Sequence, residues 1–251
     1  MDFAQATVVV TGASSGIGFG IARAFLDRGA RVVLNGRDPD RLQEAARALD
    51  APERTATVAG ATGDAATGEA LVRTAVERFG GVDVLVNNAG GFASRPFTEV
   101  TEEELDGFLT GNLRGTFLTT QAVVRRLREQ GRGGSVVSIG TALVDHPVGA
   151  FPSSAPAASK AGVHSLTLSL AVELAPDNIR VNLVAPGVIR TPATDRSDPA
   201  TLEFLSSFAL LGRLGEVAEI AEAVVHLAGA EFITGQLLRV DGGRGTAARP
   251  R

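Results

Sequence analysis

Hydrophobic positions along the chain form two alternating kinds of segment. Short apolar runs rich in valine alternate with longer stretches in which apolar residues recur at helical spacing. This alternation is typical of successive strand–helix–strand units around a parallel sheet that is buried on both faces. Strands are predicted at Thr7 to Val10, Arg31 to Leu34, Thr55 to Val58, Val84 to Asn87, Ser135 to Ile139, Arg180 to Val184 and Leu237 to Val240.

The stretches with helical spacing lie between these runs and predict helices on both faces of the sheet. They cover Ile17 to Arg28, Pro39 to Leu49, Thr67 to Phe79, Thr101 to Gln130, Ser154 to Leu174 and Val217 to Ala228. This order predicts an α/β fold, a Rossmann-like, doubly wound parallel sheet of about seven strands. No repeat or low-complexity linker interrupts the 251 residues, so one domain over residues 1–251 is expected, with a flexible tail at residues 243–251.

Composition narrows the classes of function that the chain can have. Acidic and basic residues are interspersed and the formal net charge is −4, which argues against a surface for nucleic acid or anionic membranes. The chain contains no cysteine, so disulfides and thiolate metal sites are excluded, and no metal is expected. No run of about 18 apolar residues occurs, and a strand begins too early to leave room for a signal peptide. A soluble, cytoplasmic protein that acts on a small molecule is the simplest expectation.

A glycine-rich turn follows the first predicted strand and leads into an amphipathic helix. Its glycines permit a tight turn close to a pyrophosphate, while the N–H groups and dipole of the helix attract the anion. Glycine clusters also occur in ordinary tight turns. The position between strand and helix nevertheless favours a nucleotide site, and the expected binding residues are Gly12, Ser14, Ser15, Gly16, Ile17 and Gly18.

The end of the second predicted strand bears on the choice of cofactor. Dinucleotide folds often place a carboxylate there to bind the ribose 2′-hydroxyl, but this chain has Asn35, Gly36 and Arg37. A guanidinium beside an uncharged corner suits a 2′-phosphate, so NADP(H) is expected more than NAD(H). The alternative is that Arg37 is an ordinary residue before the helix.

Further motifs in order along the whole chain resemble those of the short-chain dehydrogenase/reductase superfamily. They are Asn87-Asn88-Ala89-Gly90, Arg180-Val181-Asn182, Pro186-Gly187 with Ile189 and Thr191, Thr234-Gly235, and Asp241-Gly242-Gly243. The resemblance implies that the cofactor also contacts Asn88, Ala89, Gly90, Pro186, Gly187, Ile189 and Thr191. It further implies a homo-oligomer, a tetramer or dimer, with the fourth and fifth long helices at one interface.

The same resemblance assigns roles near the reacting atoms. Asn112 corresponds to the asparagine of a water-linked proton relay, and Thr141 takes the place of the substrate-binding serine. Lys160, the single lysine of the chain, corresponds to the lysine that holds the nicotinamide ribose and lowers the pKa of a catalytic tyrosine. The chain contains no tyrosine, and Pro156 occupies that position. Ala61 stands where the family commonly has an aspartate against the adenine.

A different proton donor would be needed if the chain carries out the family's reaction. His146 is one candidate because imidazole titrates near neutral pH, although a solvent-exposed loop histidine is the simpler interpretation. Lys160 is another, acting directly or through a water, with a pKa lowered by partial burial. His164 and His226 are expected to be packed or structural.

Three functions are compatible with these residues. The first is an NADP(H)-dependent carbonyl reductase or alcohol dehydrogenase with a donor other than tyrosine. The second is a non-redox enzyme, such as a cyclase, dehydratase, isomerase or aldolase, and the third is a catalytically silent NADP-binding protein. The substrate is expected to bind between the loops Gly91 to Pro96, Ala142 to Ala155 and Ile189 to Leu211. A fairly hydrophobic or cyclic substrate is expected, because phenylalanines lie in or near these loops; they are Phe92, Phe97, Phe151, Phe204 and Phe208.

Overall fold

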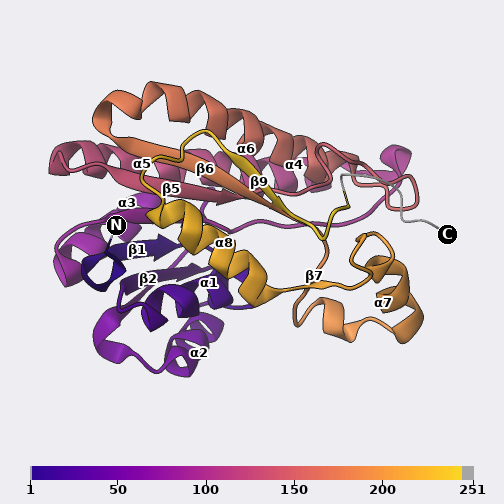
Figure 1. Cartoon of the computed structure of the whole chain (residues 1–251), viewed down its shortest axis with the longest axis horizontal. Coiled ribbons are helices and arrows are strands. Elements are labelled where there is room, and N and C mark those ends of the chain that lie inside the picture. The colour runs from indigo at the N-terminus through magenta and orange to yellow at the C-terminus, as the bar shows by residue number, and fades with distance from the viewer. Residues whose placement is uncertain (1, 245–251) are drawn as a thin grey trace.

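The computed structural model describes residues 2–244 and has a central seven-stranded sheet (Figure 1). The strand order is β3-β2-β1-β4-β5-β6-β9, and every neighbouring pair is parallel. The predicted fold class and all seven predicted strands are confirmed. The strands are β1 (Thr7–Val10), β2 (Arg31–Gly36), β3 (Thr55–Ala59), β4 (Val84–Asn87), β5 (Gly134–Ile139), β6 (Ile179–Pro186) and β9 (Leu237–Val240).

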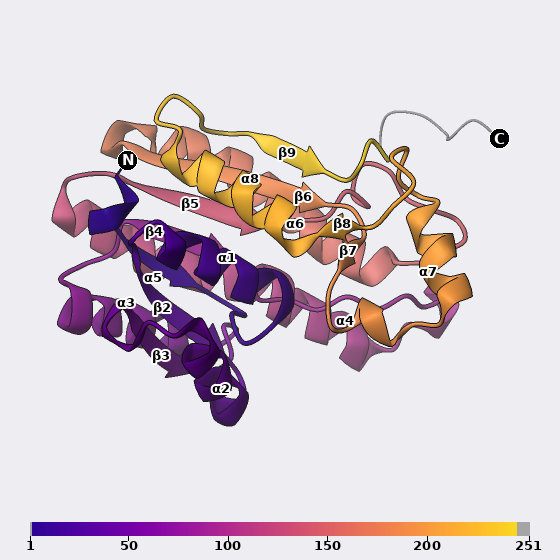
Figure 2. The ribbon, with the colours of Figure 1, turned by 60° about the horizontal axis from the view of Figure 1, so that its bottom comes forward.

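Helices cover both faces of the sheet (Figure 2). One face carries α1 (Gly16–Asp27), α2 (Pro39–Leu49) and α8 (Val217–Gly229), and the other carries α3 (Ala65–Phe79), α5 (Gly115–Gln130) and α6 (Ser154–Glu173). Alternate strand residues point to opposite faces, so Val8 and Val10 join the first core and Val9 joins the second. Because each strand is buried on both sides, its sequence is a continuous apolar run.

The expected single helix from Thr101 to Gln130 is wrong in its middle. The chain forms α4 (Glu102–Phe108), then a π-helical segment at Leu109–Arg114, and then α5. The wider π turn holds the fully buried Asn112, whose side chain bonds the backbone of Gly91 rather than facing solvent. Such turns often occur at functional sites, and helical periodicity alone does not reveal them.

Two elements after β6 were not predicted. They are α7 (Pro199–Ser206) and a short parallel ladder between β7 (Ile189–Arg190) and β8 (Gly215–Glu216). The start of α7 is nevertheless marked in the sequence. The Asp198 side chain accepts a hydrogen bond from the N–H of Thr201, and a proline follows at the first helical position. Both elements stand at the end of the molecule remote from the N-terminus (Figure 1).

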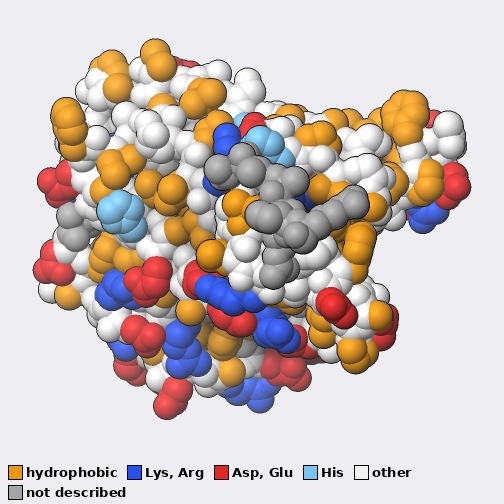
Figure 3. Space-filling model, turned by 45° about the vertical axis from the view of Figure 1, so that its right-hand side comes forward, with side chains coloured by type: hydrophobic (Ala, Val, Ile, Leu, Met, Phe, Trp, Pro, Cys, Tyr) orange, Lys and Arg blue, Asp and Glu red, His pale blue; other side chains and the backbone are white. Residues whose placement is uncertain are grey.

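Several further features concern the described chain as a whole. Gly243 and Arg244 belong to a turn after β9, whereas residues 245–251 of the expected flexible tail lie outside the described residues. Within residues 2–244, no helix is long and apolar enough to cross a membrane, and no cluster of potential metal ligands occurs. On the face in Figure 3, acidic and basic side chains are mixed rather than gathered by sign.

The strand order places a natural binding position at the carboxyl ends of β1 and β4. Successive crossovers run from β1 outward to β3, and then from β4 outward to β9 in the opposite direction. At such a switch point the loops after the two central strands diverge and leave a crevice. The candidate site therefore lies where the glycine-rich turn meets the segment after β4.

Candidate functional site

A long groove opens at this switch point and consists of two adjoining cavities. The inner cavity, about 470 Å³, contains Lys160 and Thr141, and the outer cavity, about 650 Å³, contains Arg37. The two cavities share Gly12, Ser15, Arg41, Gly90 and Gly91 along their walls. We refer to them together as the groove.

The glycine-rich turn forms one wall of the groove and is held in place by the segment after β4. The Thr11 hydroxyl accepts hydrogen bonds of 3.0 Å from the N–H groups of Asn88 and Ala89. The Asn88 amide in turn donates to the carbonyls of Thr11 and Gly12, at 3.0 and 2.9 Å. Gly12 has φ +62°, and an added Cβ would lie 2.8 Å from the Ala89 Cα. Only glycine fits that close approach without strain.

The start of α1 is open toward the groove. Ser15 is its N-cap, and its side chain makes no capping hydrogen bond. The first N–H groups of the helix are therefore left for another acceptor, and the helix dipole favours an anion there. With Gly12, Ser15, Gly16 and Ile17 on the groove wall, the turn fits a pyrophosphate.

The outer cavity holds the residues expected to decide between NADP(H) and NAD(H). Arg37 and Arg41 line it, both are exposed, and neither side chain has a hydrogen bond or ion pair within the described part of the chain. The Asn35 side chain is directed to β3 and the residue after it, because its amide donates hydrogen bonds of 3.0 Å to the carbonyls of Val58 and Gly60. Ala61 also lines this cavity. Arg41 was missed by sequence analysis because its side chain reaches the groove from the first turn of α2.

The inner cavity brings three of the predicted catalytic residues to one region. Thr141 and Lys160 line it, and a Cβ on Gly90 would lie 2.5 Å from Asn112 Oδ1 and 3.2 Å from Lys160 Nζ. Asn112 accepts from the Gly91 N–H at 2.8 Å and donates to the Ser159 hydroxyl at 2.8 Å. Asn112 thus fastens the segment after β4 to helix α6, which carries Lys160.

Lys160 has an unusual environment for a lysine. Its Nζ donates to the carbonyl oxygen of Ile139 at 2.7 Å, and no carboxylate pairs with it within residues 2–244. Burial without a compensating negative charge lowers the pKa of Lys160 to about 8. An amine with such a pKa is able to give or take a proton near neutral pH.

Position 156 contributes no ionisable group to the groove. Pro156 is buried in the first turn of α6, where a missing backbone N–H costs no helical hydrogen bond. Its carbonyl accepts from the Ser159 hydroxyl at 2.8 Å, and its ring lines a small neighbouring cavity beside Phe108. The helix begins at Ser154 as predicted.

The histidines lie outside the inner cavity. His146 is half-buried in the loop after β5, its Nε2 is buried without a hydrogen-bond partner, and it does not line the groove. His164 is packed behind the groove, where a Cβ on Gly140 would lie 2.5 Å from its Nε2. Burial lowers the pKa of His164, which disfavours the charged form of its imidazole. His226 is exposed on α8.

The loop after β6 closes the groove on the side facing the glycine-rich turn. Pro186, Gly187 and Thr191 line the inner cavity as expected, but Ile189 is buried and lines a different cavity behind the loop. The exposed Arg196, which sequence analysis missed, also lines the inner cavity. Its position depends on the path of this loop, which no periodic pattern reveals.

Two aromatic rings stand near the mouth of the inner cavity. Phe92 and Phe151 stack with ring centroids 5.6 Å apart and planes inclined by 6°. Their loops are joined because the N–H of Arg95 and the hydroxyl of Ser94 both donate to the Pro152 carbonyl. Of the five phenylalanines expected around a substrate, only Phe92 lines the groove, and Phe208 lines the cavity behind the loop.

Comparisons with known proteins agree with this arrangement. A family model described as enoyl-(acyl carrier protein) reductase matches residues 12–244. L-rhamnose 1-dehydrogenase (NAD(P)(+)) of Azotobacter vinelandii is 42% identical over 250 residues, covering 94% of this chain and 95% of that protein. A 3alpha-hydroxysteroid dehydrogenase of Mediterraneibacter gnavus is 37% identical, covering 93% of this chain and 94% of that protein. Among solved structures, a short-chain type dehydrogenase/reductase from Mycobacterium marinum superposes with a TM-score of 0.91 at 31% identity, covering 98% of both chains.

Proposed function

The chain belongs to the short-chain dehydrogenase/reductase superfamily and is an oxidoreductase of that type, and we propose that it uses NADP(H) with a proton donor other than tyrosine. The proposed reaction converts a carbonyl into a hydroxyl, or the reverse, on a fairly hydrophobic small molecule. One observation carries this proposal: a single groove joins two arginines, neither paired within residues 2–244, to a lysine of lowered pKa at its inner end.

The outer end of the groove supports the choice of NADP(H). Arg37 and Arg41 carry positive charge without a carboxylate partner among the described residues, and Asn35 adds no negative charge. A 2′-phosphate is well matched to two guanidinium groups, because arginine binds phosphate oxygens in a bidentate manner. The NAD(P)(+) named for the Azotobacter relative is compatible with either cofactor.

The inner end supports Lys160 as the proton donor. NADP(H), when bound, supplies or accepts the hydride. In the direction of reduction, the Lys160 ammonium gives a proton to the substrate oxygen while the carbonyl carbon is reduced. The Thr141 hydroxyl, on the same cavity wall, orients that oxygen. In the direction of oxidation the neutral amine takes the proton from the hydroxyl. His146 has no part in this step because it does not line the cavity.

The size and lining of the inner cavity support a compact substrate. The stacked rings of Phe92 and Phe151 give the mouth an apolar side, whereas Thr141 and Lys160 provide polar groups deeper inside. A cyclic hydroxyl or ketone compound with one apolar face fits this distribution. Named relatives act on sugars and on steroids, which are cyclic in both cases.

A non-redox enzyme on the same scaffold is a second candidate, and one observation favours it. Pro156 offers no acid where the family resemblance implies a tyrosine, and such a change is compatible with a cyclase, dehydratase, isomerase or aldolase. In that case Thr141 and Lys160 would orient an electrophile, and the oxidation state of the cofactor would stay constant.

We also propose a homo-oligomer that works in the cytoplasm. Exposed apolar side chains lie on α5 and α6, the two helices that the resemblance places at an interface; they are Phe117, Leu168 and Val172. Covering such side chains with a second copy would remove apolar surface from water. The absence of cysteine from the whole sequence supports the reducing compartment.

One experiment separates the candidate functions. Purified protein is mixed with NADPH or NADH and a panel of cyclic ketones and aldehydes, and nicotinamide absorbance is followed over time. Oxidation of NADPH in preference to NADH is the expected result. A product of unchanged redox state would point to the second candidate, and cofactor binding without any product would indicate a silent binding protein.

A further inference from the structure

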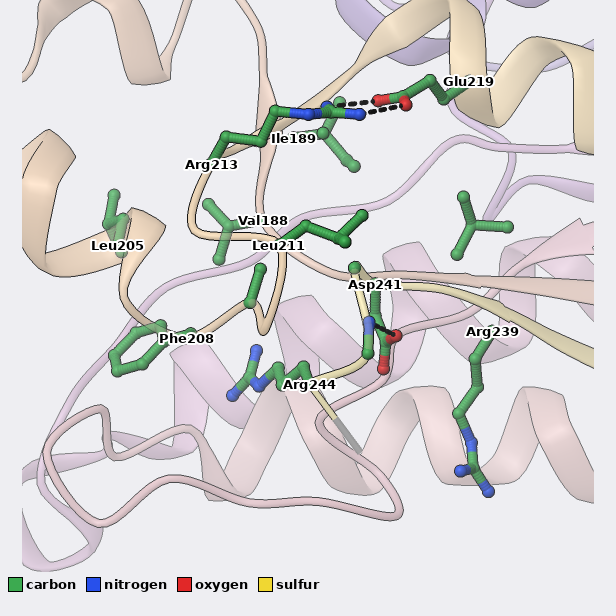
Figure 4. A pocket seen from close by; sticks show the side chains of 15 residues that line it. Val188, Ile189, Leu205, Phe208, Leu211, Arg213, Glu219, Arg239, Asp241 and Arg244 are labelled. Carbon is green, nitrogen blue, oxygen red and sulfur yellow. Dashed lines mark hydrogen bonds and ion pairs between the residues drawn. The ribbon is translucent and has the colours of Figure 1, made fainter. Parts of the chain in front are cut away.

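A separate cavity of about 210 Å³ lies behind the loop that follows β6 (Figure 4). None of the residues that line it also lines the groove. It is enclosed by the end of α7, the segment leading to β8, and the turn after β9. We call it the rear cavity. Much of its wall is apolar, from Val188, Leu205, Phe208 and Leu211.

Two of the three arginines at the rear cavity already have carboxylate partners. Arg213 bonds Glu219 in a bidentate manner at 2.6 and 2.9 Å, and this pairing holds the pKa of Glu219 at about 2. Arg239 bonds Asp145 at 3.2 Å. Figure 4 shows Arg213 directed toward Glu219 and Arg239 turned away from the other two arginines. Arg213 is therefore held by Glu219, and Arg239 is directed away from Arg244.

Arg244 differs from both. Its guanidinium lies over the ring of Phe208, 5.2 Å from the centroid, and points into the cavity between that ring and Asp241 (Figure 4). Its Nε and Nη2 are buried and have no hydrogen-bond partner within residues 2–244. Burial lowers the pKa of Arg244, although the nearby charge of Asp241 opposes this. Buried polar atoms without a partner are rare, because each costs the desolvation of a strong donor.

The identity of the two partnerless atoms indicates what they bind. Nε and Nη2 lie on the same edge of the planar guanidinium, and their N–H groups point the same way. That edge matches the two oxygens of a carboxylate, which accepts both hydrogen bonds in parallel. Behind the edge, the Phe208 ring and the aliphatic wall leave room for a short apolar body.

From these contacts we propose that the rear cavity is a binding site for a small organic carboxylate, separate from the groove. The carboxylate pairs with Nε and Nη2 of Arg244, and its hydrocarbon part packs against Phe208, Leu205 and Leu211. A small ligand is favoured over a protein segment because the cavity holds few atoms and is walled by several separate parts of the same chain.

The site is tested by calorimetric titration of the full-length protein, saturated with NADP⁺, with hexanoate and benzoate. Saturable binding of at least one of them is expected, with hexanol binding much more weakly because it lacks the charge. Arg244→Gln should weaken binding of the carboxylate about tenfold or more, since the bidentate pair is lost. Arg239→Gln serves as the matched control, because it removes a lining arginine already paired with Asp145, and it should bind as the wild type does.

Three results would overturn the proposal. They are the absence of carboxylate binding by the wild-type protein, equal binding by Arg244→Gln, and displacement of the carboxylate from the wild type by NADP⁺ in a competition titration. Thermal melting of each variant checks that it is folded. A variant that melts early is replaced by Arg244→Lys, which keeps the charge but removes the bidentate edge and should also weaken binding.

Discussion

At the scale of single residues, Lys160 is the clearest case of an environment that changes chemistry. It is the one lysine in the chain, and it lies in a cavity where its Nζ meets a carbonyl oxygen rather than a carboxylate. Loss of hydration penalises the ammonium, which brings the pKa from 10.5 to about 8. A residue that would otherwise stay charged at all physiological pH values therefore becomes able to exchange protons.

The pH dependence of activity follows from this pKa. In the proposed mechanism reduction needs the Lys160 ammonium, so kcat/KM for a ketone should be flat below pH 8 and fall above it, while oxidation of the alcohol should rise over the same range. Lys160→Ala should lower kcat by about 10²- to 10⁴-fold. In Lys160→Arg the guanidinium stays protonated, so any remaining activity should lack the inflection. Wild-type turnover by Lys160→Ala would contradict the assignment.

Arg37 and Arg41 carry the predicted preference for NADP(H). Replacing both with alanine should raise the Kd for NADP⁺ by about 10- to 100-fold, because charge-assisted hydrogen bonds to the 2′-phosphate are lost. The Kd for NAD⁺ should change little, which fluorescence titration of both cofactors would measure. Arg47→Ala is the matched control, since Arg47 lies exposed on the same helix but outside the groove. Equal losses for NADP⁺ and NAD⁺ would count against a 2′-phosphate contact.

Most single residues of the candidate site could be predicted from the sequence, and the exceptions have a physical reason. The glycine-rich turn, Asn88 and Thr141 lie at the groove because each follows a strand whose end is fixed by the sheet. Lys160 reaches the groove from helix α6, where its Nζ donates to the carbonyl at the end of β5. Whether the side chain of Arg196 or His146 reaches the groove depends on the path of an irregular loop. That path is not encoded in hydrophobic periodicity.

At the scale of elements, the site depends on close contact between backbone segments. The turn after β1 packs on the segment after β4, and the π-helical segment places Asn112 between that segment and α6. Sequence periodicity predicted the helices and strands but merged α4 and α5 into one. The interruption is tertiary in origin, since it satisfies the backbone of Gly91, which is far away along the chain.

A pair of glycine substitutions tests the importance of backbone contact. An alanine at Gly18 would place its Cβ on the carbonyl oxygen of Gly12 and against the Asn88 amide. Gly18→Ala should therefore lower the free energy of unfolding by about 1–3 kcal/mol and weaken cofactor binding. Gly107→Ala meets nothing within 4 Å, so in a helix it should raise stability by about 0.5–1 kcal/mol. Urea denaturation of both variants gives the comparison, and similar effects from the two would refute the argument.

At the scale of the whole molecule, the strand order decides where function can arise. The reversal between β1 and β4 opens the groove, and the helices on both faces leave the carboxyl ends of these strands accessible. The fold class followed from alternating segments because parallel sheets require a crossover helix between strands. Strands β7 and β8 could not be predicted in this way, because each has two residues, which is too short for a recognisable hydrophobic pattern.

The proposed homo-oligomer is tested on α6. The double substitution Leu168→Asp and Val172→Asp places charges on an exposed apolar face and should convert an oligomer into smaller species. Light scattering coupled to gel filtration measures the mass. Phe97→Asp is the control, because Phe97 is an exposed apolar residue that lies outside this helix. An unchanged mass for the double variant would place the interface elsewhere, and a monomeric wild type would exclude it.

The central claim is hydride transfer at the groove, and isotope labelling tests it most directly. The protein is incubated with NADPH deuterated at the transferable position and with a cyclic ketone from the panel that it converts. Mass and NMR spectra of the product should show one deuterium on the carbinol carbon and one equivalent of NADP⁺ formed. A product without deuterium, formed while the labelled NADPH is recovered unchanged, would contradict the assignment as an oxidoreductase.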